Sequence, residues 1–211
     1  MPIILKTGAD SSEEIILNQA VEILAGGGII AYPTETFYGL GADATNEKAI
    51  EKIFAVKGRN FKNPISLIIG QPEDIYPLVK DIPESARKLM ATFWPGALTI
   101  VFQASHTISP LLTAGSGKIG LRVSSHPIAL QIVQKLERPL TATSANLSGS
   151  PECSRASEVA EQIGDKLDAI VDGDKTQGGK TSTLIDVTCD PPVILREGAI
   201  SRETIKKCIN S

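Results

Sequence analysis

Short apolar runs at irregular intervals constrain the fold of this chain more than any other feature. Apolar runs rich in β-branched residues predict strands at 28–33, 65–69, 97–103, 118–123, 140–143, 169–171, 183–187 and 193–196. Helical periodicity is predicted at 47–57, 84–92, 127–136, 156–163 and 201–209. Because several strands follow one another without a helix between them, a regular doubly wound parallel sheet is disfavoured. We expect an α/β fold with a twisted, open, mixed sheet flanked by helices.

One more helix is predicted near the N-terminus from the signals at its two ends. Ser11 and Glu14 have the spacing of a capping box, so this helix should begin at Ser11 or Ser12. Apolar residues with helical period follow, and the glycines at 26–28 should end it.

The composition is typical of a globular chain and excludes several classes of protein. The 211 residues are 42% apolar, and no apolar run approaches the ~18 residues that span a bilayer. Three separated cysteines form neither a disulfide framework nor a CxxC zinc site. No basic region precedes the first apolar stretch, so a secretory signal is not predicted. We therefore expect one domain over 1–211, a cytoplasmic location and no membrane contact.

The net charge argues against tight, charge-driven binding of nucleic acid. It is −3 at pH 7, whereas a protein that grips a polynucleotide backbone is normally basic. Nine aromatic residues also offer few platforms on which bases could stack. Any contact with RNA should therefore be local or transient.

Several familiar motifs are absent. The chain has two histidines, too few for a histidine-rich metal site, and it has no GxSxG nucleophile elbow. His126, ahead of Pro127, is interpreted as a loop residue at a helix start. The segment 113–120 (TAGSGKIG) looks like a P-loop but lacks the first glycine and the Ser or Thr after the lysine. No metal site belonging to the protein itself is predicted.

Polar residues gather instead in clusters that interrupt apolar segments. The first cluster, 32–41 (YPTETFYGLG), places Thr34, Glu35 and Thr36 together in a turn bounded by proline and glycine. A structural turn needs the proline and the glycines but not this polar trio. We therefore interpret the cluster as functional.

A second cluster, 57–63 (KGRNFKN), holds Lys57, Arg59 and Lys62 at the C-terminal end of a predicted helix. Cations are favourable at such an end simply because they offset the helix dipole. Lysine and arginine together would also suit a polyanion such as a triphosphate.

The remaining clusters follow predicted strands. The segment 141–149 (TATSANLSG) is either an ordinary Ser/Asn turn or a binding segment, in which small residues let the backbone approach a ligand while Ser144 and Asn146 form hydrogen bonds. The segment 181–183 (TST) and Arg196 form a weaker cluster. Arg122 interrupts an apolar strand, and a buried cation needs a partner, which is either an anionic ligand or an internal carboxylate.

Together these segments resemble the YrdC-like threonylcarbamoyl-AMP synthases. The resemblance covers about 15–209 and rests on six blocks in one order: PTET–YGLG, KGR with Asn63-Pro64, LRV with His126-Pro127, TSAN–SG, STLIDV and ILREG. Its most diagnostic part pairs Lys57-x-Arg59 with Ser144-x-Asn146. It implies the YrdC-like fold, a twisted open α/β sheet whose concave, basic face binds ligands. Such a face would reconcile the acidic pI with cations gathered at one site.

The resemblance also implies an activity. Members of the family synthesise threonylcarbamoyl-AMP from L-threonine, bicarbonate and ATP, release pyrophosphate, and so supply the modification of the adenosine beside the tRNA anticodon. Magnesium is expected to arrive with ATP. No protein nucleophile is required, so catalysis should depend on positioning and charge. Expected partners are ATP, L-threonine and bicarbonate, with transient contact to tRNA or a transferase complex.

Carried over residue by residue, the resemblance implies two sets of substrate-binding residues. Arg122 would hold the threonine carboxylate with two hydrogen bonds, and Lys57 and Arg59 are favoured for stabilising the phosphates. The ATP-binding set is Lys57, Arg59, Asn63, Ser144, Asn146 and Arg196. The threonine-binding set is Thr36, Arg122, Ala142, Thr143 and Ser182.

Two positions depart from the family pattern. Ile68 stands where many longer members have a histidine that touches threonine, and Glu152 stands where they have a serine near the nucleotide. We expect Ile68 to supply part of an apolar wall for the threonine methyl group.

Two alternative functions stay open. One is adenylation of a carbamoyl group, as in hydrogenase-maturation carbamoyltransferases, whose zinc-finger and acylphosphatase segments are not expected here. The other is a non-catalytic RNA-binding or ribosome-maturation factor on the same fold. The intact Lys57/Arg59 and Ser144/Asn146 pairs favour the use of ATP over binding alone.

Overall fold

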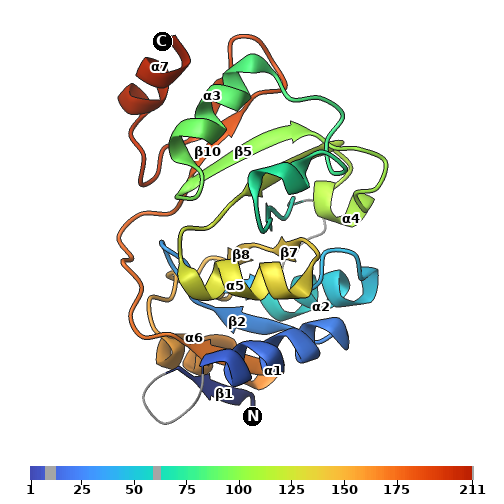
Figure 1. Cartoon of the computed structure of the whole chain (residues 1–211). Helices are drawn as coiled ribbons and strands as arrows, with labels where there is room; N and C mark the ends of the chain where they lie inside the picture. The colour runs from blue at the N-terminus through green and yellow to red at the C-terminus, as the bar shows by residue number, and fades with distance from the viewer. Residues whose placement is uncertain (8–12, 59–62, 211) are drawn as a thin grey trace.

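The computed structural model describes residues 1–7, 13–58 and 63–210. Within them, strands form two mixed sheets, with helices packed against both (Figure 1). The order of strands is β1–β9–β2–β3–β8 in the first sheet and β11–β10–β5–β6–β4–β7 in the second. The expected mixed α/β class is thus confirmed, although two linked sheets replace the single sheet that the sequence predicts.

The first sheet is built around a buried parallel strand. Both β1 (Ile3–Lys6) and β2 (Ile30–Tyr32) run parallel to β9 (Ala169–Asp172). Antiparallel to β2 lies β3 (Gly39–Gly41), which pairs in turn with β8 (Thr143–Ser144). The continuous apolar run in β9 reflects its interior position between β1 and β2, because both of its faces are covered.

The second sheet alternates parallel and antiparallel pairs. Its strands, in spatial order, are β11 (Val193–Arg196), β10 (Thr183–Asp186), β5 (Leu98–Gln103), β6 (Lys118–Arg122), β4 (Leu67–Ile68) and β7 (Leu140–Thr141). The β10–β5 and β6–β4 pairs are parallel, and the other three are antiparallel.

The chain crosses from the second sheet to the first within 140–144. The sequence predicts one strand at 140–143, and this prediction is wrong. Leu140–Thr141 pairs with β4, whereas Thr143–Ser144 pairs with β3. Between them, the Ala142 amide donates to the Ser66 carbonyl at 2.7 Å. Tertiary pairing therefore divides a run that looks continuous in the sequence.

The helices are α1 (Glu13–Ala25), α2 (Glu47–Lys57), α3 (Glu84–Phe93), α4 (Pro110–Thr113), α5 (Pro127–Leu136), α6 (Ala156–Ile163) and α7 (Arg202–Asn210), with 3-10 turns at Pro72–Ile75 and Gly164–Lys166. The predictions for α2, α5 and α6 are confirmed at both ends. Asn46 caps α2 by accepting from the Ala49 amide at 3.2 Å, and Pro127 occupies the first turn of α5. The predicted cap at Ser11 or Ser12 lies outside the described residues.

Strand β3 is one of the elements that no sequence pattern predicts, together with β1 and α4. A β-carbon at Gly39 or Gly41 would lie 2.9 or 2.8 Å from the ring of Tyr32. That ring is fully buried, and its hydroxyl donates to the Thr141 carbonyl at 2.9 Å. Glycine is therefore required in β3 by close packing rather than by a turn.

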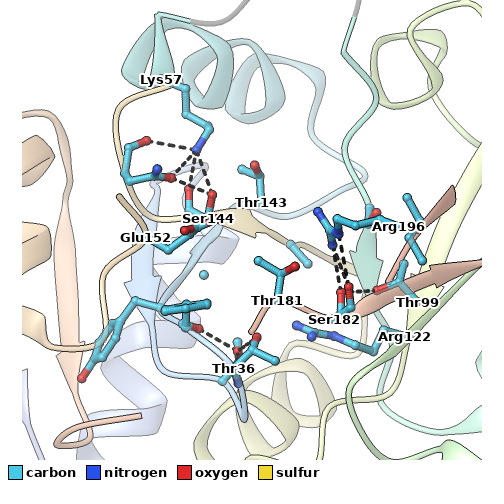
Figure 2. Close-up of a pocket in the computed structure, with 18 of the residues that line it drawn as sticks. Thr36, Lys57, Thr99, Arg122, Thr143, Ser144, Glu152, Thr181, Ser182 and Arg196 are labelled. Carbon is cyan, nitrogen blue, oxygen red and sulfur yellow. Dashed lines mark hydrogen bonds between the residues drawn. The ribbon is translucent and has the colours of Figure 1, made fainter. Parts of the chain in front are cut away.

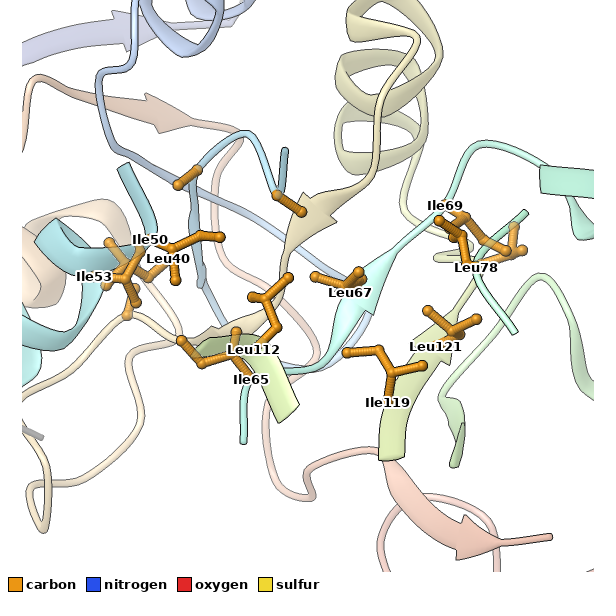
Figure 3. Packing of buried hydrophobic residues seen from close by; sticks show 14 of the residues in the cluster. Leu40, Ile50, Ile53, Ile65, Leu67, Ile69, Leu78, Leu112, Ile119 and Leu121 are labelled. Carbon is orange, nitrogen blue, oxygen red and sulfur yellow. The ribbon is translucent and has the colours of Figure 1, made fainter. Parts of the chain in front are cut away.

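One apolar core cluster spans both sheets. It joins Leu40 of β3 and Ile50 of α2 to Leu67 of β4 and Leu121 of β6 (Figure 3). A second cluster packs α1 and α5 over β2 and β9. None of the helices in 1–7, 13–58 and 63–210 is long and apolar enough to span a bilayer.

Candidate functional site

A cavity of about 640 Å³ is lined by residues of both sheets (Figure 2). Its volume falls within the ~300–1,000 Å³ of small-molecule sites. The charged side chains among its described lining residues are three cations, Lys57, Arg122 and Arg196, and one carboxylate, Glu152. The cavity therefore favours an anionic ligand.

The structure brings together the residues that the sequence singles out. Those described that line the cavity are Thr36, Lys57, Asn63, Arg122, Ala142, Thr143, Ser144, Asn146, Ser182 and Arg196. They come from the β2–β3 turn, the end of α2 and the loop before β4, the strand ends of the second sheet, the crossing segment 140–144 and the loop after β8. Arg59 lies outside the described residues.

Lys57 forms the centre of one polar group in the cavity. Its ammonium donates to the carbonyl and side-chain oxygens of Asn146, both at 3.0 Å, and to the Ser144 carbonyl. The residue is 4% exposed and is the last residue of α2. This arrangement attaches the helix end to the segment that follows β8.

Arg196 and Ser182 form a second polar group, on the other side of the cavity in Figure 2. The Arg196 guanidinium donates to the Ser182 carbonyl at 2.9 Å and to its hydroxyl at 3.3 Å. The Ser182 hydroxyl also lies 2.9 Å from that of Thr99. Thr99 lines the cavity too, but a single threonine within an apolar strand gave no signal in the sequence.

Thr34 and Thr36 organise the turn between β2 and β3. The Thr34 hydroxyl donates to the Phe37 carbonyl at 2.7 Å and lies 3.1 Å from the Thr36 hydroxyl. Since Thr34 has a single hydroxyl proton, the Thr36 hydroxyl is the donor in the contact between them. The lone pairs of the Thr36 oxygen can then accept a hydrogen bond from a ligand.

Arg122 pairs with Glu35 inside the protein. Its Nη1 lies 3.0 Å from Glu35 Oε1, and the two side chains are 8% and 9% exposed. Ser124 donates to the other carboxylate oxygen. The Arg122 guanidinium makes no other ion pair or hydrogen bond within the described part of the chain, and it lines the cavity. Both interpretations of Arg122 in the sequence, internal carboxylate and ligand, are therefore compatible.

Two further residues can now be placed. His126 immediately precedes α5 in extended backbone, as its interpretation as a loop residue at a helix start predicts, and its side chain makes no capping hydrogen bond. Burial lowers the pKa of its imidazole, although Glu35 nearby opposes this. Ile68 is 0% exposed, lies in the second core cluster and is not among the described residues that line the cavity. The expectation that it forms an apolar wall for a ligand is wrong, because it packs into the core instead.

The described side chains that could ligate a metal ion do not gather into a metal site. Within 1–7, 13–58 and 63–210, no three His, Cys, Asp or Glu side chains converge in a way that could hold a metal ion. A single exposed carboxylate, Glu152, lines the described cavity. The described residues therefore offer no set of side chains that would fit a resident magnesium ion.

Comparisons with known proteins identify the family of this chain. A model of the Sua5/YciO/YrdC family, described as "Telomere recombination", matches residues 22–198. A threonylcarbamoyl-AMP synthase of Pyrococcus abyssi is 42% identical over 197 residues, which are 93% of this chain and 58% of the relative. A second one, of Photobacterium profundum, is 39% identical over 86% of this chain and 98% of its own length.

A solved structure resembles this chain equally well. P. abyssi Sua5 complexed with L-threonine has a TM-score of 0.93 and is 40% identical. The match covers 99% of this chain and 61% of that chain. This chain therefore spans about three fifths of these P. abyssi proteins.

Proposed function

Because this chain belongs to the Sua5/YciO/YrdC family, we propose that it condenses L-threonine, bicarbonate and ATP into threonylcarbamoyl-AMP. In this reaction the threonine nitrogen bonds to the bicarbonate carbon and water leaves. A carbamate oxygen then bonds to the α-phosphorus, and the bond from that phosphorus to pyrophosphate breaks. The names of the relatives support the activity, and L-threonine in the P. abyssi structure supports the amino-acid substrate.

The threonine end of the reaction fits the group around Arg122. With Nη1 on Glu35, the rest of the guanidinium can hold a carboxylate through two hydrogen bonds. Thr36 offers an acceptor for the ammonium or hydroxyl of threonine, and Ser182 offers its hydroxyl. The Ala142 and Thr143 backbone lines the same cavity.

The nucleotide end fits the remaining residues. We assign Asn63, Ser144, Asn146 and Arg196 to the ATP site, together with Arg59, which lies outside the described residues. Magnesium enters as part of the substrate, bound to the ATP phosphates, since the chain offers no site of its own in its described part.

The contact between Arg196 and Ser182 is the observation that supports this function best. The two residues are assigned to different substrates, yet they lie within hydrogen-bond distance of each other. A reaction that joins a threonine-derived carbamate to an α-phosphorus requires the two substrates to meet at such a point. Positioning of this kind can supply much of the catalysis without a protein nucleophile.

We further propose that the protein acts in the cytoplasm and that its product serves the modification of tRNA. A contact with tRNA would be transient, since the net charge is −3.

The proposed reaction is tested by pyrophosphate release from ATP. We expect release that depends on both L-threonine and bicarbonate and that requires magnesium. An Arg196→Ala variant should lose at least ~90% of the rate, since a charge-assisted hydrogen bond contributes ~1.5–3 kcal/mol. A matched control is Arg87→Ala, which removes an exposed arginine from α3. Release that is independent of threonine would refute the proposal, and release with bicarbonate and ammonia or carbamoyl phosphate instead would favour carbamoyl adenylation.

A further inference from the structure

Lys57 is surrounded by oxygen atoms of its own chain. Its Nζ lies 3.0 Å from both Asn146 oxygens, 3.5 Å from the Ser144 hydroxyl, and closer still to the Ser144 carbonyl. An ammonium has three protons to donate, and four acceptors already compete for them. A phosphate oxygen could be added only by displacing one of these bonds.

The backbone of Lys57 is attached to the same segment. Its carbonyl accepts from the Ser148 amide at 3.2 Å, and Asn146 Nδ2 donates to the Ser150 carbonyl at 2.6 Å. Gly58 ends α2 at this point in a left-handed conformation, with φ at 56°. One buried residue therefore connects the helix end to residues across 144–150.

The lysine also decides which atoms of this segment donate and which accept. Since an ammonium can only donate, the side-chain atom of Asn146 that faces it must be the oxygen, and the amide nitrogen must face Ser150. The Ser144 hydroxyl lies 2.6 Å from the same oxygen and donates its one hydrogen to it. Ser144 can then offer a ligand only a lone pair.

A hydroxyl oriented in this way does not suit phosphate. The oxygens of a triphosphate are acceptors and need donors, whereas the ribose hydroxyls and the adenine amino group are donors. The nucleoside part of a nucleotide is therefore the chemistry that Ser144 would recognise.

We propose that Lys57 is a positioning residue, which holds the 144–150 segment and orients the Ser144 hydroxyl to accept from the nucleoside, and that it does not itself bind the phosphates. This inference rests on the proposed function only in taking an adenine nucleotide as the ligand. It replaces the phosphate role that the sequence favours for Lys57.

The two roles differ in which ligands lose affinity when the ammonium is removed. The affinities of ATP, ADP, AMP and adenosine are measured by calorimetry for the wild type, Lys57→Met and the control Lys48→Met, which removes an exposed lysine from α2. We expect Lys57→Met to weaken all four ligands by a similar factor, about tenfold or more. A loss confined to ligands with phosphates, with adenosine unaffected, would overturn the inference.

Two more variants keep the test decisive if Lys57→Met does not fold. Lys57→Gln keeps two N–H donors without the charge, so it should bind ATP better than Lys57→Met does. If Lys57→Met does not fold, Lys57→Gln should bind ATP with an affinity within about tenfold of that of the wild type. Combining Lys57→Gln with Ser144→Ala should cost less than the sum of the two single effects, because both act on one network. Additive losses would place Lys57 on the ligand itself.

The outcome is separable from that of the proposed function. If the wild type binds adenine nucleotides but releases no threonine-dependent pyrophosphate, the proposed function fails while the ligand series still decides the role of Lys57. If the wild type binds no adenine nucleotide, both proposals are refuted.

Discussion

At the scale of single residues, Arg122 both forms a buried ion pair and lines the cavity. Glu35 and Ser124 hold one side of an ion pair in which both charged side chains are nearly buried. An arginine divides its donors between an internal carboxylate and a ligand because its guanidinium presents five N–H groups in a fixed plane. The ion pair thus orients the side that faces the cavity.

We predict that Arg122→Lys raises the KM for threonine about tenfold or more and changes the KM for ATP far less. A point charge cannot both pair with Glu35 and reproduce a two-pronged bond to a carboxylate, and each charged hydrogen bond contributes ~1.5–3 kcal/mol. The measurement is pyrophosphate release at varied threonine and saturating ATP. Arg87→Lys on α3 is the control, and an unchanged threonine KM in Arg122→Lys would exclude the two-pronged contact.

Glu152 allows a test in which a substitution should lower a KM rather than raise it. It is exposed, lines the cavity and adds a negative charge close to the region assigned to ATP. We predict that Glu152→Ser lowers the KM for ATP a few-fold, and more at low salt, because charge repulsion at a surface is weak and screened. Glu161→Ser, outside the cavity, should leave this KM unchanged. A raised KM in Glu152→Ser would mean that Glu152 helps to bind the nucleotide.

At the scale of elements, the best predictions are those with local end signals. Helices α2, α5 and α6 begin and end where the sequence indicates, since caps, Pro127 and Gly58 act on their own neighbours. The two-residue strands β7 and β8 exist only through their partners, so residues 140–143 read as one strand. The convergence of the site depends on the same long-range pairing, and only the family resemblance could predict it.

Strand β3 provides a stability test at this scale. We predict that Gly41→Ala destabilises the protein by ~1–3 kcal/mol, because its β-carbon would lie 2.8 Å from the buried Tyr32 ring. Urea unfolding measures the change. Gly164→Ala is the control, since its β-carbon would meet nothing closer than 3.5 Å and its backbone is already helical. Equal stabilities of the two variants would show that the ring moves aside.

At the scale of the whole molecule, the residues that we assign to the threonine substrate come from both sheets. Thr36 follows β2 of the first sheet, whereas Arg122 and Ser182 belong to β6 and the start of β10 in the second. A ligand that contacts all three stabilises the folded arrangement of the two sheets, because it binds the folded chain and not the unfolded one.

We predict that threonine at 100 times its dissociation constant stabilises the protein by about 2.7 kcal/mol, seen as a rise in Tm. At the same concentration serine should give a smaller rise and valine the smallest, because a site built to bond a hydroxyl rejects an analogue that lacks it. Thr36→Ala should remove most of the rise while leaving the unliganded Tm nearly unchanged. A valine effect equal to that of threonine would contradict the assigned roles of Thr36 and Ser182.

The crossing at Ala142 has a consequence for how this protein can change over evolution. The backbone leaves one sheet and enters the other across a single residue, with two paired residues on each side. Adding or deleting one residue there would turn the side chains of β7 or β8 to the opposite face. Ser144 would leave its place beside Lys57, and the lining of the cavity would change with it. The length of this segment is therefore tied to the lining of the cavity, and we expect it to tolerate insertions and deletions less well than substitutions.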